Sequence, residues 1–218
     1  MTIARTLTGV RQAYTQAARA AASLLAHPAI ASSWDQPSAL ERYAVSGLAG
    51  HLAGQIFFAE NALARPEPNI EPISLLEYYD RVAWIRSGPD SDPHVRIRRG
   101  SEMLAADGAA ALVARTDAAM ARLPELLAAT PVPRLVQLPS WEWALTFDDF
   151  LRSRLIELTV HIDDLAVSVD LPIPTLPPQI TELVLDVLTK LATRTHGVAA
   201  VLRALTRSER APASIAAF

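Results

Sequence analysis

Apolar residues recur every three to four positions along most of the chain, a spacing that places them on one face of a helix. Stretches that alternate between apolar and polar residues, the pattern of a half-buried strand, are seldom found. In the first helical stretch the apolar positions are Leu7, Val10, Tyr14, Ala17, Ala21 and Leu24. The pattern predicts helices over residues 3–26, 40 or 43 to 64, 74–86, 92–128, 147–168 and 179–206.

Residues that start or stop helices mark the ends of these segments. Ser74 and Glu77 form a capping box, in which each side chain bonds to a free backbone N–H at the start of the helix. Gly108 and Pro124 predict bends in the long fourth helix, and Gly197 predicts a break in the last one.

Four long helices, one short accessory helix and long crossovers predict an all-α four-helix bundle with an additional C-terminal helix. We expect residues 1–218 to form a single domain, with the core bundle in 1–170 and a helix and tail in 171–218. A proline-rich stretch over 130–143 is expected to be a loop.

Composition and net charge mainly exclude certain classes of function and location. The net charge is −3 with both signs interspersed, so nucleic acid is not an expected partner. One basic cluster, Arg96, Arg98 and Arg99, is either a solvated helical face or a rim that binds an anion. The chain shows neither an apolar signal core nor a run of roughly 18 apolar residues that would span a membrane, so the expected location is the cytoplasm.

The candidate chemistry begins with Glu157 and His161, which lie four residues apart and therefore on one face of the predicted helix 147–168. Their neighbours are mostly apolar, and a carboxylate in such surroundings needs a compensating cation. Asp164, one turn further on, is placed to accept the second N–H of the His161 ring, the usual support for a metal-binding histidine. Arg154, one turn earlier, is a candidate contact for a substrate anion.

His51 is the candidate third ligand. It lies in an apolar helix with three glycines, where each glycine costs up to about 1 kcal/mol relative to alanine. We expect another helix or a ligand to approach the backbone closely there. These glycines are Gly47, Gly50 and Gly54. Two histidines and one carboxylate leave an open position on zinc, the arrangement of catalytic sites, and the same set suits nickel or ferrous iron.

The segment around His51 and the later series Arg154, Glu157, His161 and Asp164 together resemble the DinB-like superfamily. Within it the chain is most similar to the mycothiol-dependent maleylpyruvate isomerase and thiol S-transferase group. The resemblance implies an up-down-down-up bundle, a divalent metal on His51, Glu157 and His161, and a mycothiol-like thiol that reaches the open metal position.

We therefore expect a metal-dependent transferase in which a small thiol attacks an electrophilic substrate. The chain contains no cysteine, so the sulfur must come from that small molecule. The isomerases carry a second α/β domain that contributes to catalysis, where residues 171–218 offer only a helix and a tail, so S-transfer is preferred over isomerisation. The alternatives are a metal-dependent hydrolase or isomerase on the same scaffold, or a metal-binding helical module without catalysis. A homodimer formed through bundle helices is compatible with each of them.

Several further residues have two interpretations. Gln55 either faces the pocket or makes a core hydrogen bond, and Trp141 and Trp143 either cover the bundle or stack on a substrate. His196 marks a helix break and is a weaker candidate for a substrate contact. His27 and His94 are expected on the surface.

Overall fold

The computed structural model describes residues 8–218, apart from the side chain of Arg86, so the predicted helical residues 3–7 lie outside the described part. The long helices before residue 170 are α1 (Gly9–Leu25), α3 (Val45–Leu63), α5 (Asp92–Ala105), α6 (Ala109–Ala129) and α7 (Phe147–Ser168). The C-terminal helices are α8 (Pro178–His196) and α9 (Val198–Thr206). Shorter elements are α2 (Pro28–Ser32), α4 (Leu75–Arg81), η1 (Ala83–Arg86), η2 (Ser208–Arg210), β1 (Leu135–Val136) and β2 (Leu145–Thr146).

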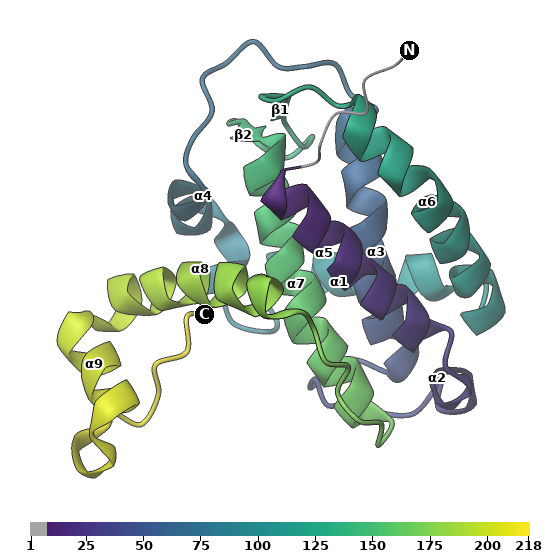
Figure 1. The fold of residues 1–218 in the computed structure, drawn as a ribbon. Coiled ribbons are helices and arrows are strands. Elements are labelled where there is room, and N and C mark those ends of the chain that lie inside the picture. Colours follow the sequence, from purple (N-terminus) through teal and green to yellow (C-terminus); the bar gives the residue numbers. More distant parts are fainter. Residues whose placement is uncertain (1–7) are drawn as a thin grey trace.

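Helices α1, α3, α6 and α7 form the bundle, and α5 packs along α3 (Figure 1). Arg11, near the start of α1, bonds to the carbonyl of Leu127 at the end of α6 and to Asp148 at the start of α7. Glu60, near the end of α3, pairs with Arg122 in the second half of α6. Helices α1 and α7 therefore run in one direction and α3 and α6 in the other, which confirms the predicted all-α, up-down-down-up bundle.

Local sequence explains where the helices begin and end. The predicted capping box is present: the Ser74 hydroxyl accepts from the backbone N–H of Glu77, whose carboxylate accepts from the backbone N–H of Ser74. Gly108 has a φ of 87°, so the single helix predicted over 92–128 is wrong and is instead α5 and α6. Pro124, the other predicted bend, lies inside α6.

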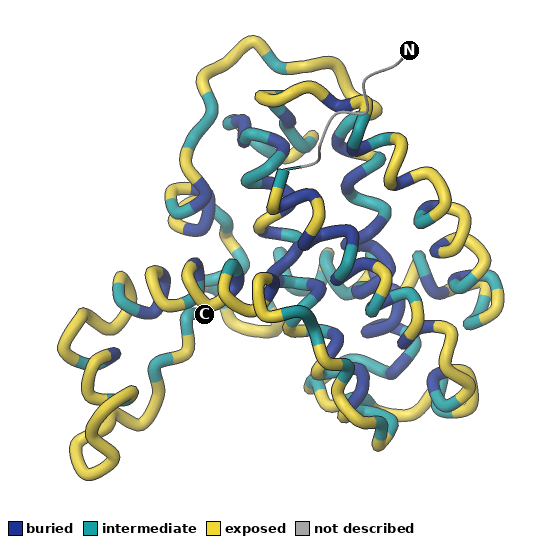
Figure 2. The backbone as a smooth tube through the Cα atoms, viewed as in Figure 1, coloured by how far each residue is buried: buried dark blue, intermediate teal, exposed yellow. Residues whose placement is uncertain are grey.

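Helix α3 is the central helix of the molecule. It contacts α1, α5, α6 and α7, and most of its residues are buried. Figure 2 shows buried backbone concentrated along α1, α3 and α7. Because α3 is enclosed on several sides, any polar side chain that it carries must find partners on a neighbouring helix.

The C-terminal helices lie beside the bundle rather than within it. Helix α8 contacts α7 and α1, while α9 extends away from the bundle (Figure 1). The predicted break at Gly197 is confirmed, with a φ of 81° between α8 and α9. Within the described residues, none of the helices is both long and apolar enough to cross a membrane.

Helix α2 and the strands β1 and β2 were not predicted. Helix α2 occupies one turn directly after His27, which accepts a bond from the backbone N–H of Ala29 through its ring. The proline-rich stretch expected to be a loop contains β1, which pairs antiparallel with β2 just before α7.

Candidate metal centre

His51, Glu157 and His161 converge at the contact between α3 and α7. The Nε2 atom of His51 lies 3.2 Å from Oε2 of Glu157, and Nε2 of His161 lies 3.3 Å from the same oxygen. The three ligand atoms are all within 4.8 Å of one another. The side chains are 14, 13 and 17 % exposed, in the order of the chain, so they are shielded but still reach solvent.

Asp164 lies behind His161, as predicted for an outer partner. Its Oδ2 atom is 2.8 Å from Nδ1 of His161, which leaves Nε2 of the ring directed at Glu157. Burial alone would lower the pKa of His161, but its hydrogen bonds to Asp164 and Glu157 raise that pKa to about 9. The pocket therefore favours positive charge at this position.

The pKa of Glu157 shows that the site also favours the ionised form of this carboxylate. Burial would raise it, but hydrogen bonds with His161 and His51 and the charge of Arg154 hold the pKa well below its ordinary value. The pKa of His51 is lowered, mainly by burial. At neutral pH the site thus contains an ionised carboxylate and a histidine that tends to be uncharged.

This donor set fits a divalent cation. Two imidazole nitrogens and one carboxylate oxygen are the ligands that zinc, nickel and iron accept in proteins. With Asp164 bonded to Nδ1 of His161, Nε2 faces the same small volume as Oε2 of Glu157, where it holds a proton in the absence of metal and presents a lone pair once that proton is released. Acceptor atoms that converge in this way repel one another unless a proton or a metal ion lies between them.

Arg154 lies one turn before Glu157 and does not bond to it. Its Nη1 donates to Oε1 of Gln55 at 2.8 Å, and its Nη2 lies 3.4 Å from the hydroxyl of Tyr78. The guanidinium also sits over the rings of Phe58 and Phe150. Among the described side chains, no carboxylate lies within ion-pair distance of Arg154, which is compatible with its predicted role as a contact for a substrate anion.

Gln55 satisfies both interpretations that the sequence left open. It is 1 % exposed and makes core hydrogen bonds, and one of its contacts is with the His51 ring itself. Ser101 contacts His51 and Tyr78 contacts Arg154, and the sequence pattern pointed to neither of these residues. They lie on α5 and α4, and no periodic pattern relates residues on those helices to α3 or α7.

The close backbone approach predicted for the glycine-containing helix occurs at Gly50. A Cβ atom at this position would overlap the carbonyl oxygen of Ser101 and would lie 3.2 Å from Cβ of Ala105. Glycine is therefore required for α5 to contact the backbone of α3 beside His51.

The remaining candidates lie away from the three ligands. His27 is exposed, as predicted, whereas His94 is only partly exposed and its Nε2 lies 2.9 Å from the carbonyl oxygen of Trp84. His196 is exposed, and its ring lies 2.8 Å from the carbonyl oxygen of Ala216.

The aromatic and basic candidates make structural contacts. Trp141 packs against the rings of Tyr78, Phe150 and Trp143, as expected for a cover over the bundle. In the basic cluster, Arg98 donates to the carbonyl of Pro89.

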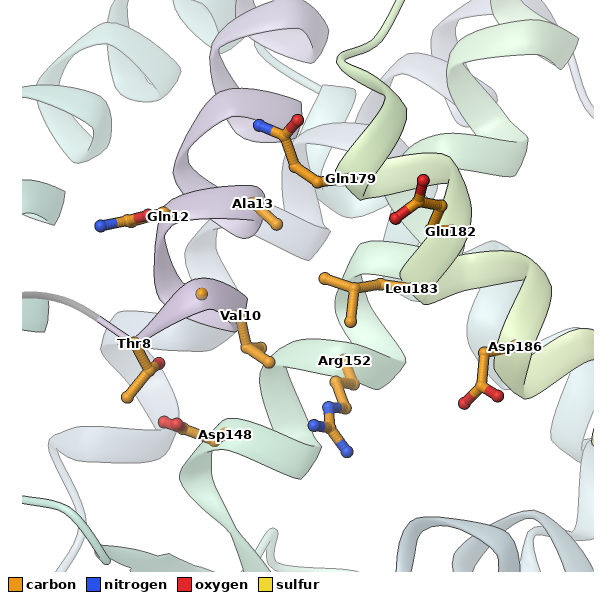
Figure 3. A pocket seen from close by; sticks show the side chains of 11 residues that line it. Thr8, Val10, Gln12, Ala13, Asp148, Arg152, Gln179, Glu182, Leu183 and Asp186 are labelled. Atoms are coloured by element: carbon orange, nitrogen blue, oxygen red, sulfur yellow. The ribbon is translucent and has the colours of Figure 1, made fainter.

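A separate cavity of about 740 Å³ lies between α1, α7 and α8 (Figure 3). Its charged lining residues are Asp148, Arg152, Glu182 and Asp186. Neither His51 nor the ligand pair on α7 lines it, so this cavity is not part of the candidate metal centre.

Comparison with known proteins identifies a family for most of the chain. A family model described as the mycothiol maleylpyruvate isomerase N-terminal domain matches residues 14–166. That range includes His51, Arg154, Glu157, His161 and Asp164. No curated protein and no solved structure matches the sequence closely enough to count as a relative.

Proposed function

Because the chain belongs to the mycothiol maleylpyruvate isomerase N-terminal domain family, a DinB-like family, we propose that it binds one divalent metal ion through His51, Glu157 and His161. The observation that carries this proposal is the convergence of three acceptor atoms within 4.8 Å of one another. Zinc is the metal we favour, and the same ligands suit nickel and iron.

We further propose that the protein is a thiol S-transferase whose co-substrate is a mycothiol-like thiol. When bound, a metal ion of this kind lowers the pKa of a coordinated thiol so that a thiolate forms at neutral pH. The sequence has no cysteine, so the sulfur has to come from the small molecule. The thiolate would form a bond to an electrophilic carbon while the leaving group departs with its electron pair.

The residues of the chain have distinct parts in this proposal. Asp164 holds the ring of His161 through Nδ1, which leaves Nε2 free to ligate the ion that the site would hold. Arg154 has no ion-pair partner among the described side chains and supplies positive charge for an anionic group of the electrophile. Its bond to Gln55 and its position over Phe58 and Phe150 keep the guanidinium near Glu157.

Metal content is the first test. The untagged protein, purified without chelator, is expected to contain about one equivalent of metal by elemental analysis, and His51→Ala and His161→Ala are expected to lose it. His27→Ala is the matched control, because His27 is an exposed histidine outside the site and should leave the metal content unchanged. A folded variant with all three ligands changed to alanine that retains the parent's metal content would contradict the site.

The second test separates the reactions. Metal-loaded protein is mixed with a chromogenic aryl halide, with and without a small thiol, and conversion of the aryl halide is followed by absorbance. Turnover that requires thiol and is lost in Glu157→Gln supports S-transfer. Turnover of ester substrates without thiol would instead assign a hydrolase, with water as the nucleophile. Metal binding without either activity would assign a non-catalytic metal-binding module.

A further inference from the structure

His51 has a hydrogen-bonding partner on the side of its ring that faces away from Glu157. Its Nδ1 atom lies 3.2 Å from the hydroxyl oxygen of Ser101, on α5. That hydroxyl donates to the carbonyl oxygen of Ile97 at 2.9 Å. A serine hydroxyl has a single hydrogen, so while it donates to Ile97 its oxygen accepts from an Nδ1–H of His51.

Contacts on the other side of the ring converge on Nε2 of His51. An arginine side chain can only donate, so the bond from Arg154 fixes the carbonyl end of the Gln55 amide toward Arg154. The amide nitrogen of Gln55 consequently faces His51, 2.9 Å from its backbone oxygen and 3.2 Å from Nε2. The Glu157 carboxylate, which only accepts, also lies 3.2 Å from Nε2, so this atom carries a hydrogen when it bonds to Glu157 and must present a lone pair to hold a metal ion.

We propose that Ser101 is a positioning residue of the metal site, which accepts from Nδ1 of His51 and so favours the ring form whose Nε2 lone pair can hold a metal ion. The inference rests on the proposed function for the presence of a metal ion, whereas the contact between Ser101 and His51 does not depend on that proposal. Once an ion occupies the lone pair of Nε2, the bond from Gln55 to that atom cannot persist, whereas the bond to Ser101 can. Ser101 therefore orients the ring of His51 through Nδ1, as Asp164 orients the ring of His161.

The packing of α5 on α3 places Ser101 at this position. Gly50 precedes His51, and its missing side chain leaves room for the Ser101 backbone, whose carbonyl carbon lies 3.1 Å from where a Cβ would be. The Ser101 side chain is itself buried, with an exposure of 4 %. Gly50 and Ser101 thus act together. The missing side chain of Gly50 lets α5 approach α3 closely, and Ser101 orients the His51 ring.

Removing the Ser101 hydroxyl has a defined consequence for the ring. In Ser101→Ala no other side chain of the described residues is shown to accept from Nδ1, so the ring hydrogen is held on Nε2 by the Glu157 carboxylate 3.2 Å away. A metal ion would then have to displace that hydrogen. We expect Ser101→Ala to bind zinc ten- to a hundredfold more weakly than the parent, the usual effect of losing such a partner.

The experiment combines two measurements on the full chain. Nitrogen-15 NMR of the histidine rings in the metal-free protein reports the His51 tautomer, and a titration with Zn²⁺ alone reports its Kd. We expect a larger fraction of the Nδ1–H form in the parent than in Ser101→Ala, with that fraction restored in Ser101→Thr. The control is Thr116→Ala, which removes a similar buried hydroxyl that donates to the carbonyl of Leu112 on α6. It should change neither the tautomer nor the Kd.

The outcomes separate this inference from the proposed function. An unchanged tautomer fraction and an unchanged Kd in Ser101→Ala would overturn the role of Ser101. A parent protein that binds no Zn²⁺ but shows the tautomer change would overturn the proposed function and leave the role of Ser101 in orienting the ring intact.

Discussion

Asp164 and Asp163 are adjacent carboxylates on α7 with different surroundings. Asp164 accepts from the ring of His161 at 2.8 Å, whereas Asp163 is exposed. A negatively charged acceptor behind a metal-binding histidine both orients the ring and makes it a stronger ligand. The pair therefore offers a controlled measurement of what the outer partner contributes.

We predict that Asp164→Asn weakens zinc binding about tenfold to a hundredfold, because the amide retains an acceptor but loses the charge. Competition with a chromophoric chelator measures the Kd. Asp163→Asn, which changes the net charge by the same amount on the same helix, is expected to bind zinc as the parent does. Equal weakening in both variants would point to net charge rather than ring orientation.

Gly50 and Gly100 contrast a required glycine with a replaceable one. Gly50→Ala is predicted to destabilise the protein by about 3 kcal/mol, since its Cβ would overlap the backbone of α5. Gly100 lies within α5 with no atom within 4 Å of the added Cβ, so Gly100→Ala should stabilise by about 0.5–1 kcal/mol. Urea unfolding measures both, and a Gly50→Ala variant as stable as the parent would contradict the close approach.

At the scale of single residues, the sequence identified the groups that repeat along one helix. Glu157, His161 and Asp164 share a face of α7, so their spacing alone brings them together. Their role as metal ligands and outer partner stays a prediction until metal is measured. Ser101 was not identified because its contact with His51 depends on how α5 packs against α3, and spacing along the chain carries no information about that contact.

Among the secondary-structure elements, Arg11 joins three helices at one end of the bundle. Its guanidinium donates to Asp148 and to the carbonyls of Leu127, Thr130 and Pro131, so it caps the end of α6 and pairs with the first turn of α7. The side chain is 3 % exposed. This single residue satisfies carbonyl groups that would otherwise be buried without a partner at the end of a helix.

We predict that Arg11→Met costs about 3 kcal/mol of stability, because it leaves several carbonyls and one carboxylate without their donor. Arg19→Met is the control on the same helix, since Arg19 is exposed, and it should change stability by less than about 0.5 kcal/mol. Chemical denaturation followed by circular dichroism gives both values. A small effect of Arg11→Met would mean that water replaces the guanidinium without loss.

Elements with strong local signals were predictable, and those that depend on tertiary contacts were not. Helix α7 has the predicted bounds, because Thr146 caps its first turn and apolar residues continue along it. The long helix predicted over 92–128 failed at Gly108, where a positive φ turns the chain. The β1–β2 pair has only two residues in each strand, too few for a periodic pattern to be visible in the sequence.

Across the whole molecule, the candidate metal centre lies in the part of the chain that the family match covers. The match ends at residue 166, before α8 and α9 begin. Apolar side chains remain exposed on α9, where Val198, Leu202 and Leu205 are 60, 55 and 68 % exposed. The single domain over 1–218 and the homodimer stay predictions, since nothing in the structure shows what covers this helix.

The tyrosines give the whole molecule a predictable response to alkali. Tyr14, Tyr78 and Tyr79 are buried, and burial is the main cause that raises the pKa of each above its ordinary value. Lys190 is the only lysine of the chain and is more than half exposed. Few other side chains therefore titrate near pH 10, and the tyrosines should dominate stability in that range.

The sign follows from the direction of the shift. A folded-state pKa above the unfolded value means that the unfolded chain releases protons first, so the stability that the tyrosines contribute is complete below about pH 10 and falls as the pH rises further. Each buried tyrosine contributes a slope of up to about 1.4 kcal/mol per pH unit. Urea unfolding at about pH 8 and about pH 11 measures the loss. Tyr14→Phe should be less stable than the parent at the lower pH, because the bond from Tyr14 to the carbonyl of Gln55 is gone. It should also lose less stability between the two pH values, and an unchanged slope would show that Tyr14 ionises in the folded protein as easily as in the unfolded chain.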